Sequence, residues 1–218
     1  MKNKKKFAVV LAGSGVYDGS EIHESTLTML EIMKNGGEYD IFAPDIDQHH
    51  VINHITGEEM TETRNVFIES ARIARGNIND LKAFHSAAYD ALMFPGGFGA
   101  AKNLCDFAFK GENCTVNPDV ETAIQSMIKA GKPIGALCIS PVILARILGK
   151  VQLTIGQDAS TAEAIESMGA THQNTNHGEV VIDANYKIAT TPCYMLDANI
   201  LEISKGAENI VKAVIKLM

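Results

Sequence analysis

The decapeptide Lys132-Pro133-Ile134-Gly135-Ala136-Leu137-Cys138-Ile139-Ser140-Pro141 is an apolar run that reaches a cysteine and continues into a helical pattern over residues 142–148. Small residues, Ala136 and Ser140, stand two positions before and two positions after Cys138. A nucleophile elbow requires small residues there, because the chain crosses over itself where a buried strand turns sharply into a helix. The segment therefore predicts a strand, an elbow with Cys138 at its tip, and a helix behind it.

The thiol of Cys138 is the expected nucleophile. At the tip of such an elbow the sulfur lies near the N-terminus of the following helix, where the helix dipole and free backbone N–H groups favour the reactive thiolate. The alternative interpretation is a buried structural cysteine, which is the usual state of a free thiol.

The other three cysteines, Cys105, Cys114 and Cys193, have no such signature around them. No two of the four form a C-x-x-C pair, which argues against a zinc ribbon or a redox dithiol of that type. Cys105 and Cys114 could pair across a loop, and the sequence leaves this open. We interpret all four as reduced thiols.

Outward from the elbow, the chain alternates apolar runs with helical patterns. Residues 8–11 and 91–94 are continuously apolar, as strands of a parallel sheet are when helices cover both of its faces. This alternation predicts an α/β fold with a doubly wound, mostly parallel sheet in a single domain over 1–218, and a site at the carboxyl ends of the strands. The expected strands are 7–11, 39–43, 91–94, 133–137, 152–155, 180–183 and 187–190, and the expected helices are 21–34, a run opening at 61, 118–130, 142–148 and 196–218.

Composition excludes several classes of protein. The 218 residues are 46% hydrophobic and carry a net charge of −7, which leaves no electrostatic footprint for nucleic acid. No window approaches the apolar length of a membrane span. A basic run, Lys2-Asn3-Lys4-Lys5-Lys6, precedes only six apolar residues, which is too short for a signal peptide. We therefore expect a cytoplasmic protein with no nucleic-acid or membrane partner.

A glycine pair follows the apolar run 91–94. Gly96 and Gly97 carry no Cβ, so their backbone N–H groups can turn toward an anion. Beside an elbow cysteine, the Gly97 N–H would supply one half of an oxyanion hole and the Ile139 N–H the other half. A plain tight turn is the alternative for a Gly-Gly pair taken alone.

A carboxylate opens the first expected helix. Ser20 is a natural N-cap and Glu21 a first-turn carboxylate, which is the structural interpretation of these residues. Glu24 lies about one turn further along the same face and could lean over the sheet edge toward Cys138. A buried glutamic acid beside a thiol would have a raised pKa and could exchange a proton near neutral pH.

Together these segments resemble the ThiJ/PfpI family of the class I glutamine amidotransferase-like superfamily, and within it the branch of isoprenoid biosynthesis proteins with an amidotransferase-like domain. The resemblance extends from residue 7 to about residue 215. The motifs that carry it are SGVYDGSEIHE (14–24), VINH (51–54), MTETRNV (60–66), PGGFGAAKNL (95–104), LTIG (153–156) and TTP (190–192).

The resemblance implies a flavodoxin-like three-layer sandwich that forms a homodimer, with Cys138 as nucleophile and Glu24 as the family's glutamate. It also implies a small-molecule aldehyde as substrate: glyoxal plus water would give glycolate without glutathione, metal or any other cofactor. A Cys138 hemithioacetal would rest its oxyanion on Gly97 and Ile139, and Glu24 would move a proton between the adjacent carbons.

Two departures from the family pattern keep other functions open. Many relatives have a histidine directly after the nucleophile, where this chain has Ile139. Amidotransferases use a late His-x-Glu pair, for which His177-Gly178-Glu179 is the match, although a polar turn is the favoured interpretation; His172 is the other candidate histidine. Glutamine hydrolysis is therefore the second hypothesis, and a cysteine redox sensor without enzymatic activity is the third.

The remaining candidates are expected around the pocket mouth. They are Glu21, His23, His54, Gly96 and Thr191, of which Thr191 follows the last expected strand. His50, His54 and Glu58 have the i, i+4, i+8 spacing of metal ligands on a helix, but Thr56-Gly57 interrupts that segment, so no metal site is expected.

Overall fold

A computed structural model describes residues 4–218, so Lys2 and Asn3 of the basic run lie outside the described residues. Within that range a seven-stranded sheet has the order β3-β2-β1-β4-β5-β9-β8, and β8 is its antiparallel member. The sheet strands are β1 (Lys6–Val10), β2 (Glu38–Ala43), β3 (Asn79–Asp80), β4 (Ala91–Phe94), β5 (Ile134–Leu137), β8 (Val181–Asp183) and β9 (Ile188–Thr191).

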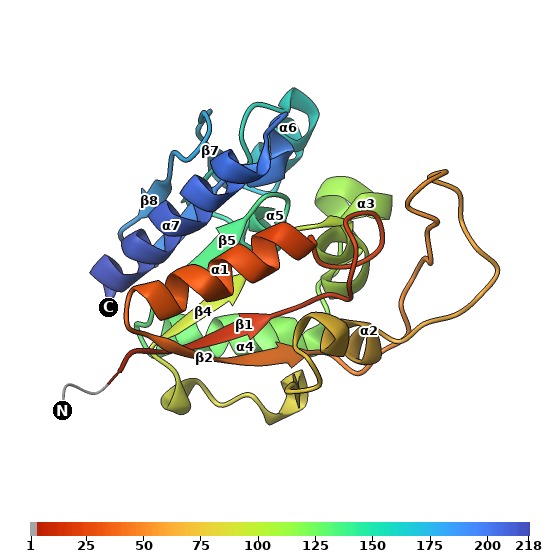
Figure 1. Cartoon of the computed structure of the whole chain (residues 1–218). Coiled ribbons are helices and arrows are strands. Elements are labelled where there is room, and N and C mark those ends of the chain that lie inside the picture. The colour runs from red at the N-terminus through yellow and green to blue at the C-terminus, as the bar shows by residue number, and fades with distance from the viewer. Residues whose placement is uncertain (1–3) are drawn as a thin grey trace.

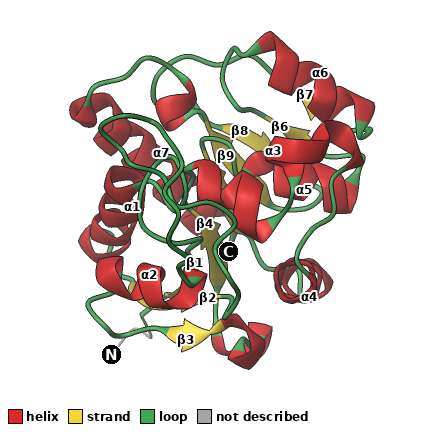
Figure 2. Cartoon of the chain, turned by 90° about the vertical axis from the view of Figure 1, so that its right-hand side faces the viewer, coloured by secondary structure: helices red, strands yellow, loops and turns green. Residues whose placement is uncertain are grey.

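Helices cover both faces of the sheet, which confirms the predicted α/β three-layer sandwich (Figures 1 and 2). On one face α1 and α7 lie side by side with α2 next to them, and on the other face lie α4 and α5. The helices are α1 (Ile22–Lys34), α2 (Val66–Ile73), α3 (Phe107–Lys110), α4 (Pro118–Lys129), α5 (Pro141–Leu148), α6 (Ala159–Ser167) and α7 (Ile200–Leu217). The short helical turns are η1 (Leu81–Ala83), η2 (Ser86–Ala88), the π-type η3 (Ala100–Leu104), η4 (Gly111–Asn113) and η5 (Cys193–Met195).

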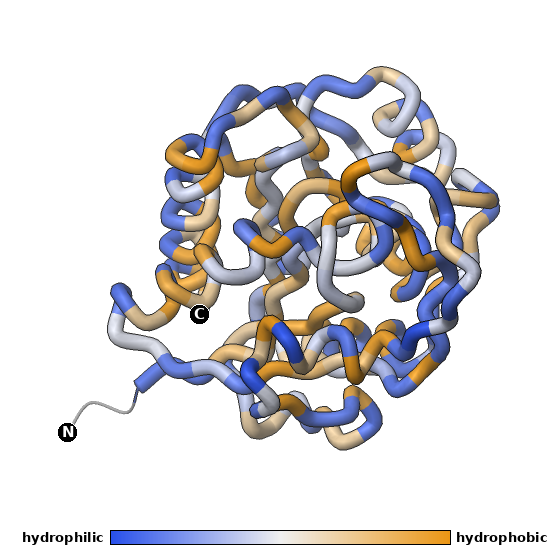
Figure 3. The backbone as a smooth tube through the Cα atoms, turned by 45° about the vertical axis from the view of Figure 1, so that its right-hand side comes forward, coloured by the Kyte–Doolittle hydropathy of each residue, from blue (hydrophilic) through white to orange (hydrophobic). Residues whose placement is uncertain are grey.

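The strands β1, β4 and β5 form the centre of the core. Apart from Lys6, their residues are buried, which explains the continuous apolar runs in the sequence. Figure 3 shows apolar segments through the middle of the molecule and polar segments mostly in the outer loops. Because β2 lies on one side of β1 and β4 on the other, the loops that leave β1 and β4 diverge at their carboxyl ends, where α/β folds place their sites.

Helix α1 differs from its sequence pattern in two ways. Its N-cap is Glu21, whose side chain accepts from the Glu24 N–H, because the Ser20 hydroxyl instead accepts from the Ala12 N–H at 2.8 Å. Leu30 and Met33 have the spacing of a buried stripe, yet both are about half exposed. The helix is rotated so that Glu24 and its neighbours face the interior, which turns part of the apolar stripe outward.

Three other predicted elements have different bounds. Residues 152–155 do not join the main sheet, because β6 (Gln152–Leu153) pairs with β7 (Thr171–His172) in a separate two-stranded sheet. Helix α2 begins at Val66 after an Asn65 cap rather than at residue 61. Helix α7 begins at Ile200, where Asn199 and Glu202 form a capping box. No helix within residues 4–218 is long and apolar enough to span a bilayer.

Candidate active site

Cys138 occupies a strained turn between β5 and α5. Its φ is 60°, in the left-handed region that few non-glycine residues adopt. The flanking Ala136 and Ser140 are fully buried, and the Ser140 hydroxyl donates to the carbonyl of Pro95 at 2.7 Å. The Cys138 N–H donates to the carbonyl of Thr191 at 3.0 Å. The elbow is thereby attached to the segments that follow β4 and β9.

The glycine pair makes room for the sulfur. A Cβ on Gly96 would clash with the Cβ of Cys138 and would lie 2.6 Å from Glu24 Oε2 and 2.9 Å from Cys138 Sγ. Gly97 has a φ of +95°, and a Cβ there would clash with the loop that follows β1. With both side chains absent, the backbone N–H groups of Gly97 and Ile139 form hydrogen bonds to the Cys138 sulfur.

Glu24 is buried directly against this sulfur. Its carboxyl oxygens accept from two backbone N–H groups, Gly96 at 2.8 Å and Tyr194 at 3.1 Å, and the carboxyl group also hydrogen-bonds with Cys138. Helix α1 and the segments that follow β4, β5 and β9 therefore meet around one thiol and one carboxyl group. Tyr194 has no sequence signal of its own, apart from its place just beyond a strand.

Burial controls the charge state of the pair. Loss of solvation raises the pKa of Glu24 from 4.5 to about 8, although the Tyr194 N–H partly opposes the shift. Burial is the main cause that raises the pKa of Cys138 above its ordinary value, and the negative charge of an ionised Glu24 is the second cause. The N–H groups of Gly97 and Ile139 lower this pKa, but only in part. The predicted resting thiolate is therefore wrong, because desolvation outweighs the helix dipole, and both protons are held at neutral pH.

The buried carboxyl group makes folding stability depend on pH. Glu24 ionises near pH 4.5 in the unfolded chain and near 8 in the folded one, so its contribution to stability falls as pH rises through that window. We expect the unfolding free energy of the wild type, relative to that of Glu24→Gln, to fall by up to about 1.4 kcal/mol per pH unit there.

Urea unfolding at a series of pH values measures this difference. The matched control is Glu31→Gln, because Glu31 is a buried carboxylate of the same helix that pairs with Lys34 at 2.6 Å. Between pH 4.5 and 8, the unfolding free energy of Glu31→Gln should change with pH more nearly as that of the wild type does than the unfolding free energy of Glu24→Gln. Parallel pH curves for the wild type and Glu24→Gln would contradict the raised pKa of Glu24.

A cavity of about 390 Å³ opens onto the sulfur of Cys138, which is only 6% exposed. Most of its wall is apolar, and its polar groups come from α6 and from the segment after β9. The lining residues are Val16, Gly97, Phe98, Ala101, Phe107, Ala108, Cys138, Ile139, Asp158, Thr161, Tyr194 and Met195. The sequence did not single out the aromatic residues and the α6 residues of this wall, because nothing local marks them.

The candidates expected at the pocket mouth divide into two groups. His23 accompanies the site, because its Nδ1 lies 2.8 Å from the Tyr194 hydroxyl and 3.8 Å from Glu21. His54 lies apart from the Cys138 cavity, against Tyr17 and Asp18. The Thr191 hydroxyl donates to the carbonyl of Glu179 at 2.7 Å, so this residue contributes its own carbonyl oxygen to the elbow rather than its side chain.

Neither candidate histidine of a triad is part of the cavity wall. His177 lies 3.8 Å from Glu202 of α7. His172 belongs to β7 and is partly buried, and its Nε2 accepts a hydrogen bond from the Ile155 N–H at 3.3 Å. Within residues 4–218, no group of three histidine, cysteine or acidic side chains could hold a metal ion.

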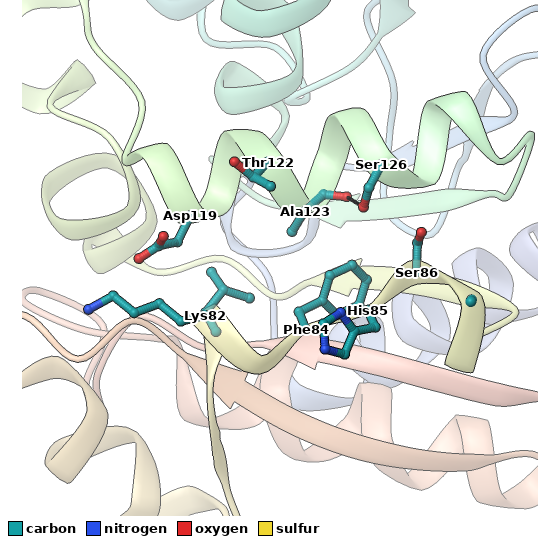
Figure 4. Close-up of a pocket in the computed structure, with 10 residues that line it drawn as sticks. Lys82, Phe84, His85, Ser86, Asp119, Thr122, Ala123 and Ser126 are labelled. Carbon is teal, nitrogen blue, oxygen red and sulfur yellow. Dashed lines mark hydrogen bonds between the residues drawn. The ribbon is translucent and has the colours of Figure 1, made fainter.

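A second hollow of about 390 Å³ lies between α4 and the segment that contains η1 and η2 (Figure 4). Lys82 and Asp119 stand near one end, and Ser86 and Ser126 near the other. It shares no lining residue with the Cys138 cavity and contains no cysteine. The thiol chemistry of the molecule is therefore confined to other parts of the structure.

Known proteins resemble this chain over nearly its whole length. No protein-family model matches it. The human glutamine amidotransferase-like class 1 domain-containing protein 3, mitochondrial, is 45% identical over 222 residues, which cover 97% of this chain and 83% of that protein. The name of that relative does not fit a strictly cytoplasmic location across such proteins.

Solved structures show the same fold. The crystal structure of an isoprenoid biosynthesis protein with amidotransferase-like domain from Ehrlichia chaffeensis has a TM-score of 0.92 at 34% identity, with 98% of this chain and 99% of that chain covered. Glyoxalase III from Candida albicans has a TM-score of 0.61 at 15% identity, with 96% and 97% covered. At that identity the similarity concerns the fold alone.

Proposed function

Because the chain belongs to the glutamine amidotransferase-like class 1 family, as its sequence motifs predicted, we propose that it is a cysteine-dependent enzyme that converts glyoxal and related small 2-oxoaldehydes to 2-hydroxy acids. The observation that carries the proposal is the contact of the Cys138 thiol with the Glu24 carboxyl group, under two converging backbone N–H groups. This set combines a nucleophile, a proton carrier and an oxyanion site.

The first step is addition of the thiol to an aldehyde carbon. The sulfur of Cys138 bonds to the first carbon of glyoxal as ionised Glu24 takes the thiol proton, and the carbonyl oxygen becomes an oxyanion. The N–H groups of Gly97 and Ile139, which already point to the sulfur, would hold that oxyanion. Glu24 then gives this proton to the oxyanion, which leaves a neutral hemithioacetal on Cys138 and restores the Glu24 carboxylate.

The second step moves hydrogen between the two carbons. Glu24 removes the proton of the first carbon and passes it to the second carbonyl oxygen, which gives an enediol. Glu24 then takes the hydroxyl proton of the first carbon while a proton is delivered to the second carbon, which leaves a glycolyl thioester. Water then hydrolyses the thioester to glycolate and free Cys138. One carbon is oxidised and its neighbour reduced, so electrons balance within the substrate, and a carboxyl group with a pKa of about 8 suits both proton transfers.

The cavity fits a small substrate of this class. Its walls around Phe98 and Phe107 are apolar and would keep bulk water away from the enediol, while Tyr194 and Thr161 offer a few polar contacts.

Glutamine hydrolysis is the competing function, and the position of His177 does not favour it. An amidotransferase triad needs a histidine beside the nucleophile, whereas His177 faces Glu202 of α7. The purified protein should be incubated in parallel with glyoxal and with glutamine, and glycolate and ammonia should be measured. We expect glycolate from glyoxal and no ammonia from glutamine; ammonia release without glycolate formation would overturn the proposal.

A further inference from the structure

Two cysteines outside the candidate active site stand at the base of one hairpin. Cys105 forms an antiparallel bridge with Val116, and the Asp106 N–H donates to the carbonyl of Thr115 at 3.1 Å. Both Cys105 and Cys114 are free thiols in the interior, with exposed fractions of 4% and 0%. The hairpin thus brings together two thiols that are nine residues apart in the sequence.

The two thiols touch and differ in character. The Cys105 thiol donates a hydrogen bond to the Ala100 carbonyl at 3.4 Å. Hydrogen bonding between the Cys105 and Cys114 side chains, together with the positive charge of Arg146, lowers the pKa of Cys114. The same hydrogen bond and burial raise the pKa of Cys105. Arg146 is held in place because its Nε donates to the Cys114 carbonyl at 2.6 Å. Cys114 is therefore the better nucleophile of the two.

A hollow lies next to Cys114, which is itself fully buried. The hollow has a volume of about 280 Å³ and is lined by Cys114, Thr115, Val116, Glu121, Arg146 and Ile147. It shares no residue with the cavity at Cys138. A hydroperoxide in this hollow would meet Cys114 before Cys105, and the Arg146 guanidinium would stabilise the oxygen that leaves as an anion.

We propose that Cys105 and Cys114 form a dithiol that hydroperoxides oxidise to an intramolecular disulfide. The Cys114 sulfur attacks one peroxide oxygen and the O–O bond breaks, which gives a sulfenic acid and, after protonation of the leaving oxygen, water or an alcohol. The Cys105 sulfur then attacks the Cys114 sulfur, the S–O bond breaks, and the oxygen leaves as water with the Cys105 proton. The two thiols lose two electrons and the peroxide gains them.

The disulfide would join the two ends of the segment that carries α3. Phe107 and Ala108 of this segment line the cavity at Cys138. Oxidation would therefore tie down one wall of that cavity without using Cys138. The modification does not depend on the proposed glyoxal chemistry, and it can be tested without measuring activity.

Trypsin separates the two cysteines, because Lys110 lies between them: Cys105 falls in the peptide 103–110 and Cys114 in the peptide 111–129. The folded protein should be treated with excess hydrogen peroxide, quenched, alkylated and digested. We expect a linked pair of these peptides that separates on reduction. Recovery of the two peptides unlinked, with both cysteines alkylated or both over-oxidised, would overturn the proposal.

Variants assign the order of attack. In Cys105→Ala the sulfenic acid on Cys114 has no resolving thiol, so a dione probe should label the 111–129 peptide. In Cys114→Ala the 103–110 peptide should stay alkylatable. Cys193→Ala, which removes a buried cysteine outside the hairpin, should form the linked pair as the wild type does. Labelling of Cys105 in Cys114→Ala at the rate of Cys114 in Cys105→Ala would overturn the assigned polarity.

Discussion

Replacement of Cys138 by alanine is expected to lower glyoxal turnover by roughly 10³-fold or more, to the level of the buffer control. Of the four cysteines, Cys138 alone belongs to the wall of the cavity described here, so no other thiol can form the hemithioacetal. Glycolate formation should be followed by NMR at saturating glyoxal. The fold should survive, because alanine is as small as the elbow requires and Cys138 itself already tolerates a φ of 60°.

The control is Cys105→Ala, which removes a buried thiol from outside that cavity. It should keep most of the activity and a circular dichroism spectrum like that of the wild type. Unchanged turnover in Cys138→Ala would sink the proposed mechanism, whereas equal losses in both variants would point to a general effect of removing buried sulfur.

Substitution of Glu24 by glutamine should lower kcat by about 10²- to 10⁴-fold, since the amide cannot carry a proton between the two substrate carbons. The wild-type kcat/KM should rise with pH, and the midpoint of this rise should lie near pH 8, where Glu24 becomes ionised and able to accept the thiol proton. This rise should vanish in Glu24→Gln. A pH-rate profile on both proteins measures the two effects together.

The matched control is again Glu31→Gln, because Glu31 lies on the same helix and is buried without contact to the thiol. It should retain the wild-type pH profile. A glutamine at position 24 can accept only one of the hydrogen bonds from Gly96 and Tyr194, so the melting temperature should be recorded for each variant. A Glu24→Gln enzyme with the wild-type midpoint would assign the proton transfer to another group.

Local steric requirements made the elbow and the glycine pair predictable from the sequence. Ala136 and Ser140 had to be small for the turn at Cys138, and Gly96 had to lack a Cβ for the carboxyl group and the sulfur to approach each other. Such requirements act over a few residues, so they are visible as motifs. The buried strands were predictable for a similar reason, since each forms a continuous apolar run.

The limits of prediction appear where contacts join distant parts of the chain. The N-cap of α1 was assigned to Ser20, because nothing in the sequence shows that the Ala12 N–H uses its hydroxyl. The exposed Leu30 and Met33 follow the spacing of a buried stripe, but α1 buries a different face, which includes Glu24. The segment at Gln152 has the composition of a sheet strand, and only packing places it in the separate sheet with β7.

Strand periodicity and turn sterics are short-range properties, so the α/β fold, the elbow and the two side chains of the candidate site were predictable from the residues alone. The charge states of those two side chains depend on long-range packing instead. Glu24 is held by N–H groups 72 and 170 residues away, and the burial that keeps its proton and that of Cys138 in place arises where α1 meets the segments after β4, β5 and β9. Desolvation is a property of the whole packed interior, so no motif records it.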